Sequence, residues 1–199
     1  QSLINFFLKF FKIDVLYLTN SFLTSIPSFV SSEDISLKSI LQRINLNFSL
    51  IIIPDFLYDS LKTELDYERI EVEEIMTLTI NKRWTIFNDY TQNLRTKYRK
   101  RIRNIFKKTT NLEKKQLNST HILDYLNDIE LLFNQVVSDS NFNGPKFDVS
   151  SFIPLVNHGY LKVYGYFLNE DFVGFSSEIM DEDVLYSYFV GFDKEINKT

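Results

Sequence analysis

Two nearly continuous apolar runs stand near the start of the chain, at residues 13–20 (IDVLYLTN) and 48–54 (FSLIIIP). Such runs are typical of strands that are buried on both faces of an α/β sheet. Between them, residues 32–44 place apolar side chains three or four positions apart. This spacing predicts a helix, with Ser32 as its N-cap and acidic residues in its first turn.

Two more elements follow before the pattern changes. Residues 56–65 predict a short helix, and residues 67–80 alternate apolar and polar positions as a strand does. The resulting order of strand, helix, strand, helix and strand predicts an α/β fold for the first eighty residues.

A long amphipathic helix is predicted from about Trp84 to Thr109. Its apolar residues recur at steps of three or four and form one sustained stripe: Phe87, Tyr90, Leu94, Tyr98, Ile102 and Ile105. We expect this stripe to face inward, and we assign Tyr98 to the core.

The last ninety residues combine a short strand, two helices and three further strands. We predict a short strand at 112–117, a helix at 121–140, and another at 148–159 that ends in the turn Asn157-His158-Gly159. Three strands joined by short polar turns then predict antiparallel hairpins, at residues 160–168, 172–180 and 184–192.

The whole pattern predicts a mixed α/β chain with two subdomains, residues 1–82 and 83–199, that meet near Asn81–Trp84. The chain begins with Gln1 and stops directly after a strong strand. We therefore expect a fragment of a longer protein.

Composition excludes several kinds of site. Hydrophobic residues make up 44% and charged residues 24% of the 199 residues, as in ordinary globular domains. Without cysteine there is no disulfide framework, thiolate nucleophile or cysteine-based zinc site, and the two histidines, His121 and His158, lie far apart, so we expect no metal. No run supplies the ~20 uninterrupted apolar residues of a membrane span, and we predict a cytoplasmic protein.

Charge is sharply polarised along the chain. Residues 95–108 contain eight basic residues and no acid, which leaves 14 basic against 26 acidic residues elsewhere. This segment is either a solvated helix whose bases pair with the acidic remainder or an anion-binding surface, since the guanidinium fork suits phosphate and carboxylate. Binding to DNA is disfavoured because the pI of about 5.3 means that the remaining surface repels phosphate.

A longer stretch that includes this segment resembles a known protein family. Residues 84–108 (WTIFNDYTQNLRTKYRKRIRNIFKK) resemble the helix that opens the second half of FemABX-like members of the GNAT acyltransferase superfamily. The residues that match this pattern are Trp84, Phe87, Tyr90, Leu94, Lys97, Tyr98, Arg99, Lys100 and Arg101. The ending at residues 167–197 resembles the antiparallel meander of a GNAT core. The likeness covers residues 65–199 well, but Thr19 and Ser25 stand where relatives tend to have glycine.

The resemblance implies a GNAT-like fold of two tandem subdomains, truncated at the C-terminus before the next helix and strand. It further implies an N-acyltransferase that uses acyl-CoA or aminoacyl-tRNA as donor, an amine as acceptor and no bound cofactor, as in bacterial proteins of peptidoglycan metabolism. In such enzymes a backbone N–H of the fourth core strand stabilises the oxyanion. By resemblance the donor would lie along Tyr188, Phe189, Val190 and Gly191.

Two side chains are candidates for catalysis. Glu178 lies in an otherwise apolar strand beside the implied donor strand and would accept a proton, although an outward-facing Glu on an alternating strand is the simpler interpretation. Tyr188 would donate a hydrogen bond to the leaving group, or pack in the core. The basic helix would hold an acidic acceptor or the phosphates of the donor through Lys97, Arg99, Lys100, Arg101 and Arg103.

Two other classes of protein remain open. The chain could be a non-catalytic module that binds RNA or an anionic polymer through residues 95–108, or a structural fragment without activity of its own. RNA binding that depends on salt, without acyl transfer, would distinguish the module.

Overall fold

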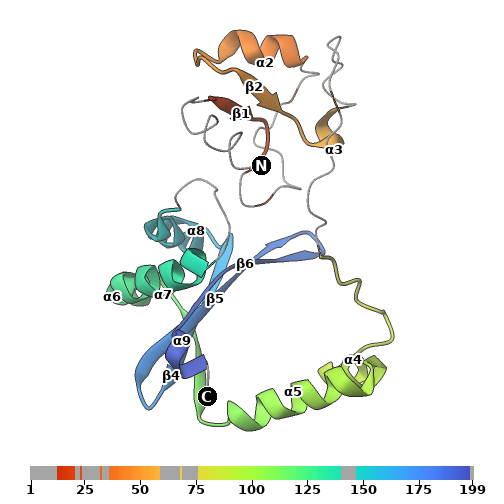
Figure 1. Cartoon of the computed structure of the whole chain (residues 1–199), viewed down its shortest axis with the longest axis vertical. Coiled ribbons are helices and arrows are strands. Elements are labelled where there is room, and N and C mark those ends of the chain that lie inside the picture. The colour runs from red at the N-terminus through yellow and green to blue at the C-terminus, as the bar shows by residue number, and fades with distance from the viewer. Residues whose placement is uncertain are drawn as a thin grey trace, which may run out of the picture. The chain divides into compact units, whose positions relative to one another are not determined.

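The structure is a computed structural model that describes residues 13–20, 23, 32, 36–58, 68, 76–139 and 147–197. These residues form two compact α/β units, one within residues 13–68 and one within residues 76–197 (Figure 1). The predicted mixed α/β class is confirmed. The subdomain boundary near Asn81–Trp84 stays a prediction.

The smaller unit is a β-α-β arrangement followed by one helical turn. Strands β1 (Val15–Tyr17) and β2 (Leu50–Ile52) pair in parallel, and α2 (Leu37–Arg43) lies in the connection between them, as parallel pairing requires. The turn α3 (Asp55–Tyr58) follows β2. A small core holds the buried side chains of Leu18, Leu37 and Leu57.

Three expectations for this part are wrong. Helix α2 is capped by Ser36, whose hydroxyl accepts a hydrogen bond from the Ser39 N–H (3.2 Å), and not by Ser32, because Ser36 directly precedes the buried Leu37. Strand β2 is not buried on both faces, since Leu50 and Ile52 are exposed in the described pair of strands. Residues 76–80 are irregular and exposed instead of a strand, and most of the predicted strand before them, like much of the helix at 56–65, lies outside the described residues.

The larger unit is built on a four-stranded antiparallel sheet. Its strands β3 (Leu112–Leu117), β4 (Leu161–Leu168), β5 (Asp171–Asp181) and β6 (Val184–Phe192) follow chain order across the sheet. Both predicted hairpins and the short strand at 112–117 are confirmed. Turn residues Asn169, Glu170 and Glu182 have positive φ, which tight hairpin turns require.

Helices cover one face of this sheet (Figure 1). They are α6 (Ser119–Asp124), α7 (Leu126–Asp139) and α8 (Phe152–Asn157), with the 3₁₀ turn η1 (Val149–Ser151) before α8. The predicted helix at 121–140 is thus two helices joined at Tyr125, whose ring stacks on Phe172 (4.9 Å between centroids). Gly159 ends α8 with φ +75°, as predicted. The turn α9 (Lys194–Asn197) follows β6.

The core between helices and sheet is aromatic and aliphatic. Its most deeply buried side chains come from all layers, namely Ile122, Ile129, Phe152, Leu161, Val163 and Phe175. Strand β4 alternates fully buried and partly exposed side chains, which means that only one of its two faces meets the helices.

The predicted long helix is broken. It consists of α4 (Phe87–Asn93) and α5 (Thr96–Lys108), separated by extended backbone at Leu94 and Arg95. The chain folds back there, so the apolar faces of the two helices meet each other, with the Phe87 and Phe106 rings 5.8 Å apart. Assigning Tyr98 to the core is wrong, because its side chain is 50% exposed. The rest of the stripe on α5 is not in the core either, since Ile105 is 51% exposed and α5 has no buried residue.

Candidate functional site

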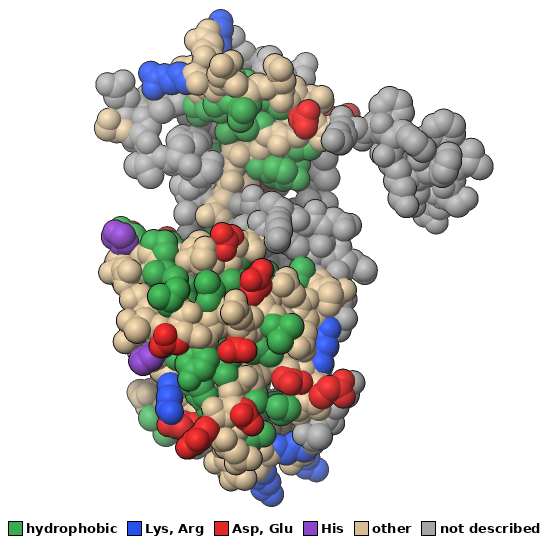
Figure 2. Space-filling model, turned by 90° about the vertical axis from the view of Figure 1, so that its left-hand side faces the viewer, with side chains coloured by type: hydrophobic (Ala, Val, Ile, Leu, Met, Phe, Trp, Pro, Cys, Tyr) green, Lys and Arg blue, Asp and Glu red, His purple; other side chains and the backbone are tan. Residues whose placement is uncertain are grey.

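Helix α5 displays its bases to solvent. Side chains of Lys97, Lys100, Arg101 and Arg103 are exposed, and among the described residues none of these four forms an ion pair with an acid. The acids lie elsewhere in the larger unit: α6 and α7 contain Asp and Glu but no Lys or Arg, and acidic side chains are scattered over the helix-covered side seen in Figure 2. For these four bases, the interpretation that they pair with acids of the chain therefore finds no support among the described residues.

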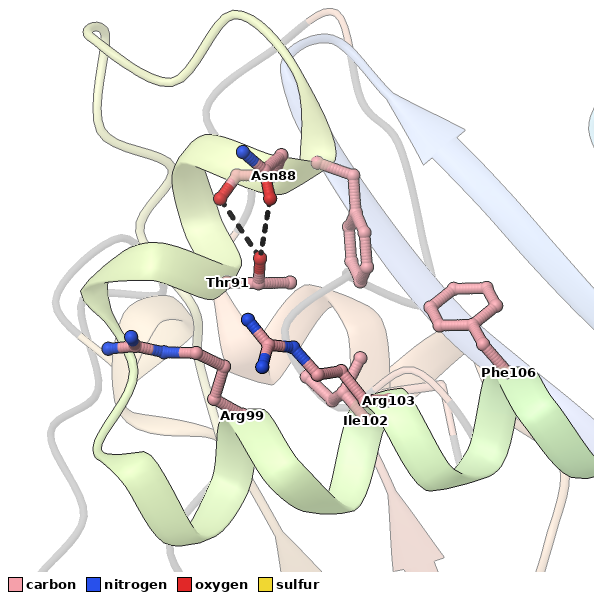
Figure 3. A pocket seen from close by; sticks show the side chains of 7 residues that line it. Asn88, Thr91, Arg99, Ile102, Arg103 and Phe106 are labelled. Atoms are coloured by element: carbon pink, nitrogen blue, oxygen red, sulfur yellow. Dashed lines mark hydrogen bonds between the residues drawn. The ribbon is translucent and has the colours of Figure 1, made fainter.

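A pocket of about 190 Å³ lies between α4 and α5 (Figure 3). It is lined by Phe87, Asn88, Thr91, Arg99, Ile102, Arg103 and Phe106. The guanidinium of Arg103 extends from α5 toward Thr91 on the facing helix (Figure 3). The Thr91 hydroxyl donates to the Asn88 carbonyl oxygen at 2.9 Å, so this wall is polar and neutral.

The side chain of Arg99, unlike that of Arg103, binds backbone carbonyls of α4 and of the residue that follows it. Its Nη2 donates to the carbonyl oxygens of Gln92 and Leu94, both at 3.0 Å, which satisfies acceptors at the end of α4 where the helix ladder stops. Its Nε is buried and has no hydrogen-bond partner. Arg99 therefore ties α5 to the end of α4, and its buried Nε presents no accessible donor to a ligand.

Glu178 lies on the face of the sheet opposite α6, α7 and α8, here called the open face because no described helix packs on it. Its carboxylate accepts a hydrogen bond from the Tyr164 hydroxyl at 3.0 Å, and Lys114 Nζ lies 3.7 Å from the Tyr164 ring centroid. Beside them the hydroxyls of Tyr166 and Ser176 are 3.0 Å apart. Burial raises the pKa of Tyr164, and the hydrogen bond to Glu178 and its negative charge raise that pKa further.

Tyr188 lies on the opposite, helix-covered face. Its ring contacts Phe147, Phe152 and Phe189 with centroids 6.0, 6.5 and 4.2 Å away, and burial raises its pKa. The structure therefore does not bring Glu178 and Tyr188 together, because the sheet separates them.

A β-bulge explains why two consecutive side chains of β6 reach this core. The register passes from Ser176 opposite Val190 to Glu178 opposite Ser187, which gives β6 one extra residue at 188–189. The buried Ser177 hydroxyl fills the gap, accepting from the Phe189 N–H and donating to the Phe189 carbonyl, both at 2.9 Å.

Strand β6 stands at the edge of the sheet, and no described strand pairs with its outer side. The N–H groups of Phe189 and Asp193 bond toward β5, to Ser177 Oγ and the Val173 carbonyl. Because backbone groups alternate along a strand, those of Val190 and Phe192 point to the open edge. This is the stretch along which the donor was expected.

Tyr164 and Ser177 were missed by sequence reasoning. The alternation of β4 puts Tyr164 and Tyr166 on the face opposite Val163, which the sequence shows, but their partners depend on the β4–β5 register. Nothing in the sequence marks Ser177, whose role exists only because of the bulge. In the described part of the chain, no group of three or more His, Cys, Asp or Glu could hold a metal.

The larger unit is thus a layered α/β unit, with an open sheet edge and a helix pair of which α5 is basic. Comparison with solved structures finds an aminoglycoside acetyltransferase from an uncultured soil metagenomic sample, in complexes with sisomicin and with trehalose. Both matches have 20% identity, TM-scores of 0.34 and 0.33, and cover 43% of this chain and 59% of the acetyltransferase. A likeness this weak carries no argument about activity. No protein-family model and no curated protein matches the chain.

Among the helices of the described segments, none has both the length and the apolar character needed to cross a bilayer.

Proposed function

We propose that the chain is an N-acyltransferase of GNAT type, whose larger unit is part of an acyltransferase core. The observation that carries the proposal is the edge of β6, where the N–H groups of Val190 and Phe192 are directed away from β5, next to a bulge at Tyr188 and Phe189. An acyl donor can pair with such an edge through its amides, as a peptide does when it adds a strand. The residue-level resemblance to FemABX-like acyltransferases supports the same function.

The reaction needs little covalent chemistry from the protein. A neutral amine attacks the carbonyl carbon of a thioester or aminoacyl ester, and the C–N bond forms as the C–S or C–O bond breaks. The amine proton passes through a base to the leaving thiolate or alkoxide. Backbone N–H groups at the open edge would stabilise the oxyanion that develops in between.

Glu178 remains our candidate for the base. It pairs across the ladder with Ser187 of β6, one strand away from the open edge, and its carboxylate is held by the Tyr164 hydroxyl. That hydrogen bond fixes the carboxylate and leaves its second oxygen to accept a proton. Tyr188 contributes through the aromatic packing that shapes the bulge, and the hydrogen bond that we expected it to give a leaving group stays a prediction.

Acetyl-CoA is the first donor to test, with aminoacyl-tRNA as the second. Isothermal titration of the full chain with acetyl-CoA at two salt concentrations would show whether saturable binding survives moderate salt, and a thiol-release assay with a panel of amines would measure transfer. We expect Glu178→Gln to lower kcat about 100-fold with little change in donor Kd. The matched control is Asp128→Asn, on the helix-covered side.

Absence of both acetyl-CoA binding and aminoacyl transfer would rule out this proposal. The bases of α5 would then favour the alternative, a module that binds RNA or another polyanion, because several of them are exposed and without acidic partners among the described residues. Its signature would be an affinity for single-stranded RNA that falls steeply and linearly with the logarithm of salt concentration.

A further inference from the structure

We infer that the pocket between α4 and α5 binds a small organic anion, namely one carboxylate or phosphate carried on a single ring or on an apolar group of that size. The inference deepens the proposed function, since any part that this anion plays in acyl transfer rests on it. Occupancy of the pocket, however, is a separate equilibrium that can be measured without any donor.

The charged end of the site is formed by Arg103. Its guanidinium extends into the pocket toward Thr91 (Figure 3), and no described acid forms an ion pair with it. None of the lining residues is acidic, and Arg99 adds a second positive charge. A carboxylate or phosphate would supply acceptors to Arg103, because the guanidinium fork matches two oxygens of either group.

The other end of the site is apolar. Phe87 of α4 and Phe106 of α5 meet edge to face with centroids 5.8 Å apart, and Ile102 completes this wall. Both rings are more than half exposed, so a ligand that covers them removes apolar surface from water. A cavity of roughly 150 Å³ accepts benzene. At about 190 Å³ this pocket therefore suits one ring with a small charged group.

Position on the helix separates Arg103 from the other bases that the sequence singled out. Lys97, Lys100 and Arg101 do not line the pocket. At 3.6 residues per turn, Arg101 lies on the far side of α5 from Arg103. Arg99 also lines the pocket, but its Nη2 already donates hydrogen bonds to the carbonyls of Gln92 and Leu94. Of the five predicted anion-binding residues, Arg103 alone offers a complete fork to this pocket.

Benzoate is the probe, with benzyl alcohol as its neutral counterpart and inorganic phosphate as the anion without a ring. Isothermal titration of the full chain gives the Kd of each. Fluorescence of Trp84, the single tryptophan, reports the location, because its ring contacts Tyr90 (5.3 Å), which in turn contacts Phe87 (5.8 Å). We expect saturable benzoate binding that is at least roughly tenfold tighter than binding of either comparison ligand.

The deciding variants are Arg103→Met and its control Arg101→Met. Arg103→Met keeps an unbranched apolar stem but removes the fork and should weaken benzoate about 10- to 100-fold, while Arg101→Met should change it less than twofold. Neither residue is buried, so both variants should keep the wild-type circular dichroism spectrum. Phe106→Ala should weaken benzoate and leave phosphate unchanged.

Two results would overturn the inference: no saturable binding of benzoate at millimolar concentration, or equal loss in Arg103→Met and Arg101→Met, which would show a general charge effect. Acetyl-CoA titrated into the same samples keeps the proposals apart. If acetyl-CoA binds and benzoate does not, the inference about the pocket is wrong and the proposed acyltransferase function is retained. If benzoate binds and no acyl transfer is found with any donor, the inference about the pocket is retained and the proposed acyltransferase function is wrong.

Discussion

The hydroxyl of Ser177 takes the place of backbone hydrogen bonds between β5 and β6 at Phe189. It accepts a hydrogen bond from the Phe189 N–H and donates one to the Phe189 carbonyl, both at 2.9 Å. Ser177 is 2% exposed, so water cannot take over this role. The bulge that brings Tyr188 and Phe189 to the same face therefore depends on one side chain.

Replacing Ser177 by alanine should destabilise the fold by about 1–3 kcal/mol, since it leaves a buried N–H and a buried carbonyl without partners. The neighbouring Ser176 is half-buried on the open face, and its partner within the described part of the chain is the Tyr166 hydroxyl, at 3.0 Å. Ser176→Ala should cost about 1 kcal/mol or less. Urea unfolding of both variants tests this, and equal costs would mean that the bulge does not need the Ser177 hydroxyl.

Gly191 should not tolerate a side chain. A Cβ at this position would lie 2.8 Å from backbone atoms of Leu132 and Phe133 in α7 and would also strike the Phe175 ring. Because backbone cannot yield cheaply, we expect Gly191→Ala to cost about 3 kcal/mol or more. At Gly159, which has open space and φ +75°, alanine should cost only about 1–2 kcal/mol of left-handed strain. Thermal unfolding that ranks the two in the opposite order would contradict the close packing of α7 on β6.

The start of α4 should depend on pH through Asp89. Hydrogen bonds from the Thr85 N–H, then the Ile86 N–H and the Thr85 hydroxyl, lower the pKa of Asp89 below 3.8. A lowered carboxyl pKa stabilises the folded state above the unfolded pKa, and this stabilisation is lost as pH falls through the folded value.

Asp89→Ala should therefore reduce amide protection in α4 at pH 7, compared with wild type at the same pH, and the difference should shrink well below pH 4. Thr85→Val removes one of the three donors and should act in the same direction more weakly. Hydrogen exchange of α4 amides measures both. A difference that persists unchanged at low pH would rule out the carboxylate as its cause.

The two tyrosines with raised pKa should respond differently to Glu178. Glu178→Gln removes a negative charge beside Tyr164, so the pKa of Tyr164 should fall while staying above 10, because burial is its first cause. Tyr188, on the opposite face and raised by burial alone, should not change. Both phenols stabilise the fold below pH 10, and that stabilisation is lost as pH rises through their folded pKa values.

Ultraviolet titration of tyrosinate in Tyr164→Phe and Tyr188→Phe backgrounds would assign each transition. A shift of the Tyr188 transition in Glu178→Gln would mean that the two side chains share a face, against the structure.

Arg99 should stabilise the helix pair through its hydrogen bonds more than through its positive charge. Arg99→Met leaves the Gln92 and Leu94 carbonyls without their donor, which should cost about 1–3 kcal/mol of local stability. The expected signs are faster amide exchange in α4 and changed Trp84 fluorescence. Arg101→Met, which loses equal charge, should show neither, and matching effects would indicate simple electrostatics.

The sequence by itself determined the elements whose patterns are local. Alternation along residues 160–192 predicts the hairpins, because each strand keeps one face on the core, and Gly159 ends α8 because a positive φ there suits glycine. The basic character of α5 also follows from sequence alone, and it led to Arg103 as one of several candidates.

Only tertiary structure decided where the long helix breaks and what its stripe contacts. No proline or glycine lies between Trp84 and Thr109, so the local pattern continues through Leu94, and the break is stabilised by Arg99, five residues further on. Likewise, the sheet places Glu178 and Tyr188 on opposite faces because a bulge in β6 shifts the alternation by one residue. Such shifts depend on pairing with a neighbouring strand, which no single stretch of sequence encodes.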